Sequence, residues 1–126
     1  MRIAVGLITA VLVASAASAQ NMNAESFHQR ALALKNKGAL AIFSRSEIKA
    51  LTGEVQAAGK MARQKRLAAV KASQAPRYCP PQGSQKMGSD ELIHRLEEIP
   101  LAERSRIDMA EAMTRILAAK YPCRAG

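Results

Sequence analysis

The chain has 126 residues, 19 of them Lys or Arg against 10 Asp or Glu, and it contains two Phe, two Tyr and no Trp. This length is typical of a single domain. No run of alternating β-branched and aromatic residues follows residue 20, which argues against a strand-based fold. Together with an alanine-rich composition, this predicts a small all-α domain of about five helical segments.

The first residues have the layout of a secretory signal peptide. Arg2 precedes the apolar run "IAVGLITAVLVA", and the small residues of "SAASAQ" follow it, which is the order of charged, apolar and cleavage regions in such peptides. The run is shorter than the roughly 20 residues that span a bilayer, which argues against the alternative of a permanent anchor. We therefore predict cleavage after Ala19, a periplasmic or secreted domain over residues 20–126, and no membrane span after cleavage.

Two short helical segments are expected next. Residues 24–36 form a plausible first helix, which would bury Phe27, Ala31 and Leu34 and end at Gly38. The apolar stretch "ALAIF" that follows predicts a brief helical turn that plugs the core.

A long helix is predicted from Ser44 to about Gln74. Ser44 and Glu47 have the spacing of a capping box at its start. The apolar stripe of this helix recurs every three or four residues and so faces one side; it consists of Ile48, Leu51, Val55, Ala58 and Ala62.

Positive charge is concentrated in residues 20–75, which we call the basic helical half of the domain. Cationic surface favours anionic partners, which outside the cytoplasm means an envelope protein or anionic envelope components, with nucleic acid not expected. The alternative is that the cations only solvate a helix face. The candidate binding surface consists of Lys49, Lys60, Arg63, Lys65, Arg66, Lys71 and Arg77.

A Pro- and Gly-rich connection over residues 76–89 leads to a two-helix part over residues 90–123. Its first helix would be capped by Ser89 and end at Pro100. Asp108 and Glu111 form a second capping box, opening a last helix that stops before Pro122. The buried sides of these two helices are predicted to be Leu92, Ile93, Leu96, Met109, Ala112, Met113 and Ile116.

The two cysteines, Cys79 and Cys123, predict one disulfide, because an exported protein matures in an oxidising compartment. Two alternatives are a metal site and a catalytic thiol. The only histidines, His28 and His94, do not have a metal-ligand spacing with them. No nucleophile elbow, phosphate-binding Gly loop or facing carboxylate pair stands out either. The sequence therefore predicts no metal, no cofactor and no enzymatic activity.

The motifs "YCPP", "SDELIHRLEEIP" and "ERSRIDMAEAMTRILAAKYPC" together resemble the C-terminal half of the Rap/Tai-type immunity family. Its members are exported helical proteins associated with type VI secretion amidase effectors. The resemblance, limited to about residues 78–123, implies a disulfide-pinned helical domain that works by binding. The matching positions are Cys79, Pro81, Leu92, Leu96, Pro100, Ala112, Ile116, Tyr121, Pro122 and Cys123.

Two functions are compatible with these features. The first is an immunity-like binding protein that inhibits a periplasmic partner by covering its surface. The second is a small stress or envelope-interaction protein, similar in build to periplasmic acid-stress chaperones, which would use its cationic helix. Binding by the second kind of protein should weaken steeply with salt.

Overall fold

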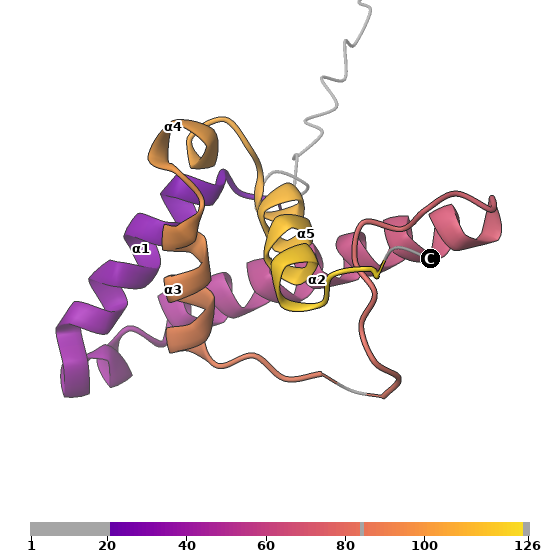
Figure 1. Cartoon of the computed structure of the whole chain (residues 1–126). Coiled ribbons are helices and arrows are strands. Elements are labelled where there is room, and N and C mark those ends of the chain that lie inside the picture. The colour runs from indigo at the N-terminus through magenta and orange to yellow at the C-terminus, as the bar shows by residue number, and fades with distance from the viewer. Residues whose placement is uncertain (1–20, 84, 125–126) are drawn as a thin grey trace, which may run out of the picture.

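The structure, a computed structural model, describes residues 21–83 and 85–124. These residues form α-helices and one 3₁₀ turn, with no strand among them, so the predicted all-α class is confirmed (Figure 1). No helix within them is long and apolar enough to cross a membrane. The predicted signal peptide lies outside the described residues. In chain order the elements are α1 (Ala24–Lys37), η2 (Gly38–Phe43), α2 (Arg45–Lys71), α3 (Ser89–Glu98), α4 (Leu101–Arg104) and α5 (Met109–Lys120).

The core lies where α5 packs across the long helix α2, and α1 and α3 pack against each other on one side of α5 (Figure 1). Ala58 and Ala62 on α2 and Ala112 on α5 are buried, and such small side chains let two helices approach closely. Larger side chains fill the space around this crossing. Buried members of the core include Phe27, Leu51, Leu92, Leu96, Met109, Met113 and Ile116, which confirms most of the predicted stripes.

Capping side chains fix where α1 and α5 begin. The Asp108 carboxylate accepts a hydrogen bond from the backbone of Glu111 at 2.8 Å, which confirms the Asp108 half of the predicted capping box. The Glu111 side chain does not reach back to Asp108, because its two oxygens accept from the Arg77 guanidinium. Asn23 caps α1 in the same way, accepting from the backbone of Glu25 and Ser26 at 3.0 and 3.1 Å. An antiparallel bridge joins Asn23 to Asp108, so the two helices start side by side.

Two other predicted caps are wrong. The Ser44 side chain makes no capping hydrogen bond to α2; it accepts one from the Lys37 ammonium instead. Glu47 does not reach back to Ser44, because both its oxygens accept from the Arg30 guanidinium at 2.6 and 2.7 Å. Ser89 is the first helical residue of α3 rather than its cap, which is Gly88.

The prediction that "ALAIF" plugs the core is also wrong. None of the residues of η2 is buried, and Phe43 keeps 82% of its surface exposed. Ile48, placed on the buried stripe of α2, is likewise exposed. Both results have one cause, since the end of α1 and the start of α2 project beyond the part of the core that α5 covers (Figure 1).

The predicted disulfide is confirmed. Cys79 and Cys123 are bonded, with their Cα atoms 4.9 Å apart, and the backbone N–H of Cys79 donates to the carbonyl of Tyr121 at 2.8 Å. The connection that follows α2 is thereby held against the end of α5. Such bonds persist in oxidising compartments rather than in the cytoplasm.

Candidate anion-binding site

The cations of α2 have no acidic partners within the described part of the chain. Seven Lys or Arg residues lie between Arg45 and Lys71, and none of them forms an ion pair there. The two carboxylates of the same helix are occupied elsewhere. Glu47 pairs with Arg30 on α1, and buried Glu54 accepts from the backbone N–H groups of Asn21 and Met22. The positive charge of α2 is therefore left for a partner outside this fold.

Five of these cations share one side of α2, which we call the basic stripe. At 100° per residue, their spacings of 4, 11, 3 and 8 residues place them within one arc, opposite the buried face that contains Leu51 and Ala58. From first to last the stripe is about 39 Å long at 1.5 Å per residue. It consists of Arg45, Lys49, Lys60, Arg63 and Lys71.

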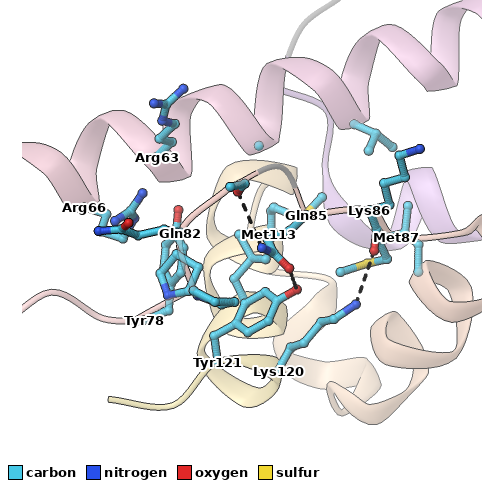
Figure 2. Close-up of a pocket in the computed structure, with 17 residues that line it drawn as sticks. Arg63, Arg66, Tyr78, Gln82, Gln85, Lys86, Met87, Met113, Lys120 and Tyr121 are labelled. Atoms are coloured by element: carbon cyan, nitrogen blue, oxygen red, sulfur yellow. Dashed lines mark hydrogen bonds between the residues drawn. The ribbon is translucent and has the colours of Figure 1, made fainter. Parts of the chain in front are cut away.

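A pocket of about 720 Å³, the basic pocket, lies beside the middle of α2 (Figure 2). Residues 78, 80–83 and 85–87 of the connection form one wall, and α2, α3 and α5 supply the rest. Apolar side chains form part of its lining, and two tyrosines, Tyr78 and Tyr121, line it near the disulfide. The apolar lining consists of Val55, Met87, Leu92, Met113 and Leu117.

Four cations also line the pocket: Arg63, Arg66, Lys86 and Lys120. The Arg66 guanidinium lies over the Tyr78 ring, 5.3 Å from its centre, and its buried Nε–H has no hydrogen-bond partner in the described structure. Lys120 is already engaged, because its ammonium donates to both oxygens of Glu91. That hydrogen bond holds the pKa of Glu91 below its ordinary value. Arg63, Arg66 and Lys86 therefore supply most of the uncompensated charge.

The described lining contains no carboxylate and no imidazole. Its guanidinium and ammonium groups are suited to holding a carboxylate or a phosphate. Within the described residues no cluster of three or more His, Cys, Asp or Glu side chains is arranged to hold a metal ion. Anion binding is thus the chemistry that this arrangement favours.

The structure separates the predicted binding residues into three groups. Arg63 and Arg66 reach the basic pocket, while Lys49, Lys60 and Lys71 lie on the basic stripe, which also includes Arg63. Lys65 is exposed but belongs to neither. Arg77 lies apart, because its guanidinium donates to both oxygens of Glu111 at 2.6 and 2.8 Å. This pair lowers the pKa of Glu111 and ties the connection to α5.

Sequence reasoning missed Lys86 and Lys120. Lys86 lies in the Pro- and Gly-rich connection and Lys120 at the end of α5, both far from the basic half along the chain. No local pattern shows that the disulfide brings these segments toward α2. The cysteine pair was the one available signal, because a bond between Cys79 and Cys123 requires the connection and the end of α5 to be neighbours.

Comparisons of the chain with protein-family models, with curated proteins and with solved structures found no match. The resemblance of residues 78–123 to the Rap/Tai-type immunity family therefore stays a prediction.

Proposed function

We propose that this chain is an exported, non-catalytic binding protein that holds an acidic partner of the cell envelope against α2 and the basic pocket. The observation that carries the proposal is the set of α2 cations without carboxylate partners among the described residues. Leaving so many like charges uncompensated on one helix raises its electrostatic self-repulsion. An anionic partner would relieve that repulsion, and its association would be electrostatically steered.

A protein is the partner that the basic pocket favours. Its lining of apolar side chains and cations suits a protruding segment that carries an apolar side chain next to a carboxylate. Binding of this kind occludes the partner's surface without chemistry, which is also what the immunity-type resemblance implies. The inhibited partner would then be a periplasmic protein with an acidic, projecting element near its active site.

The length of the basic stripe supports a second candidate. The stripe extends well beyond the pocket, from Arg45 to Lys71, and such a surface suits an extended polyanion or diffuse anionic groups of the envelope. In this case the protein would act as an envelope-interaction or stress protein. Its binding would depend on total charge rather than on any one side chain and would fall steeply as salt rises.

A pull-down from envelope extract at low and high salt, with three charge-reversal variants, separates these functions. Arg63→Glu changes the pocket and the stripe, Lys49→Glu changes the stripe but not the pocket, and Arg106→Glu is a control on an exposed cation outside both. A protein partner that uses the pocket should survive high salt and gel filtration as a complex. It should lose about tenfold or more in affinity with Arg63→Glu and little with Lys49→Glu.

A polyanion should instead respond alike to Arg63→Glu and Lys49→Glu and be released at high salt. If all three variants, the control included, bound as well as the unaltered protein, neither the stripe nor the pocket would be the binding surface and the proposal would be wrong.

A further inference from the structure

A second surface of this molecule, at the start of α2, has a different character from the basic pocket. The short η2 turn carries three large apolar side chains, Leu40, Ile42 and Phe43, which keep 65%, 56% and 82% of their surface exposed. We call these three residues the apolar tip. They lie together on a six-residue turn, so the exposure belongs to one small protrusion rather than to scattered positions.

The large residues of the turn lie outside a hollow that two of its small residues line. A 3₁₀ helix has three residues per turn, so positions i and i+3 lie on the same side. Gly38 and Ala41 form one such pair and line a hollow of about 370 Å³ next to α1 and α3. Leu40 and Phe43 form another pair, which points away from that hollow. Two of the three small residues of the turn therefore lie at the hollow, and its three large residues are exposed outside it.

Cations flank the apolar tip on both sides. Lys37 precedes the turn, and its ammonium lies 2.8 Å from the hydroxyl of Ser44 directly after it. Arg45 and Lys49 follow on the first turns of α2 and have no carboxylate partner within the described residues. The nearest acid along the chain, Glu47, is engaged by Arg30. Asp90 lines the hollow beside the turn, but its carboxylate lies 3.5 Å from the Lys35 ammonium. The surroundings of the tip therefore keep a net positive charge.

We propose that the apolar tip and its flanking cations, Lys37, Arg45 and Lys49, dock the protein onto an anionic phospholipid bilayer. Phe, Leu and Ile side chains enter the boundary between headgroups and acyl chains, while Lys and Arg remain at the level of the lipid phosphates. Each cation near an anionic membrane adds to the attraction. Along the chain, the apolar turn has a cation on each side. This order matches a bilayer surface, where apolar side chains lie below the lipid phosphates and cations lie at their level.

Two other occupants fit the tip less well. A second copy of the chain would bring the same cations against the first, and like charges facing each other oppose association. A stable protein interface also buries about 1,200–2,000 Å² in total, more than three side chains on a six-residue turn offer. A bilayer needs no matching surface and accepts a small protrusion.

The chain has no tryptophan, so Phe43→Trp places a single fluorescent reporter at the apolar tip. We expect its emission to shift to shorter wavelength with vesicles made of equal parts phosphatidylcholine and phosphatidylglycerol, and to be quenched by brominated acyl chains. Vesicles of phosphatidylcholine alone should give a much weaker response. The matched control is Leu101→Trp, which reports from a side chain that is 59% exposed on α4 and should not respond to either vesicle.

Further substitutions in the Phe43→Trp background test both parts of the proposal. Leu40→Ser should weaken partitioning into the mixed vesicles about tenfold, by loss of a buried apolar side chain. Arg45→Gln and Lys49→Gln should each weaken it about fivefold. Both reporter proteins have the same N-terminus, so any contribution from residues before Asn21 is the same in the two.

Three results would overturn the proposal. The first is an emission from the Phe43→Trp protein that does not change with anionic vesicles. The second is an equal response to the zwitterionic vesicles, which would remove the role of the cations. The third is a blue shift without lipid that grows with protein concentration, which would make the occupant a second copy of the chain.

Discussion

Glu54 is a buried acidic residue, with 2% of its surface exposed, on the face of α2 that meets the core. One carboxylate oxygen accepts from the backbone N–H groups of Asn21 and Met22 at 2.8 and 2.9 Å. These bonds fix the segment that leads into α1. Within the described structure the other oxygen is buried without a partner, so the charge depends on the two N–H donors.

Glu54→Ala should lower the free energy of unfolding by about 1.5–3 kcal/mol, because it removes hydrogen bonds to a charged group and leaves their donors unpaired. Urea denaturation followed by circular dichroism measures this loss. Gln56→Ala, an exposed substitution on the same helix, is the matched control and should change stability by less than about 0.5 kcal/mol. An unchanged midpoint for Glu54→Ala would mean that this clamp contributes nothing.

Arg104 is a second buried charged residue, and its role, like that of Glu54, could not be predicted from the sequence. Its guanidinium donates to the carbonyls of Leu96 and Ile99 at 3.1 and 2.7 Å and also pairs with Glu25. Nothing in the local sequence distinguishes this arginine from the exposed Arg106. The roles of Arg104 and Glu54 were not predictable, since both depend on backbone groups that only the tertiary fold brings near.

The connection between α2 and α3 is held to α5 by the ion pair of Arg77 with Glu111. The Arg77 hydrogen bonds lower the pKa of Glu111 from its ordinary value of 4.5. When a carboxylate has a lower pKa in the folded state than in the unfolded state, it stabilises the fold at pH values above its unfolded-state pKa. This stabilisation is lost as the pH falls through the folded-state pKa.

Arg77→Gln should therefore lower the free energy of unfolding by up to about 1 kcal/mol near neutral pH, a small value because the Arg77 side chain is 56% exposed. The difference from the unaltered protein should shrink toward zero as the pH falls below 4.5. Denaturation curves across that range measure it, with Arg106→Gln as a control that removes a cation without a carboxylate partner in the described structure. A difference that persisted in acid would contradict this role for the pair.

The sequence predicted a helix correctly where the signals, apolar spacing and capping residues, lie within the helix itself. α1 and α5 were placed correctly because their apolar residues recur with helical spacing and because Asp108 is followed by Glu111. The outcome for η2 was not predictable. An apolar turn looks the same in a sequence whether or not neighbouring helices cover it, and here they do not.

For the whole molecule, the basic pocket exists only because segments distant in the chain are brought together. Arg63 and Arg66 were predicted binding residues, but the pocket also needs Lys86 and the two tyrosines. The sequence indicated the link between these parts through its cysteine pair, without showing that a cavity would form between them. The disulfide thus connects the correctly predicted scaffold with the part of the site that was missed.

Removing the disulfide by Cys79→Ser with Cys123→Ser should lower the free energy of unfolding by about 4 kcal/mol, the chain-entropy value for a loop of this length. A domain of this size has about 5–15 kcal/mol in total, so the variant should still fold at low temperature. In hydrogen exchange, the Cys79 amide, which donates to the carbonyl of Tyr121, should lose more protection than the amides of α5.

The same variant also tests how far the two proposed surfaces are independent. Binding that uses the basic pocket should weaken, because Tyr78 and Tyr121 are no longer held beside each other. Docking by the apolar tip should persist, since Phe43 precedes α2 and lies about 30 Å from Arg63 along the axis of that helix. Equal loss of both activities in a variant that remains folded would show that the two surfaces act as one site.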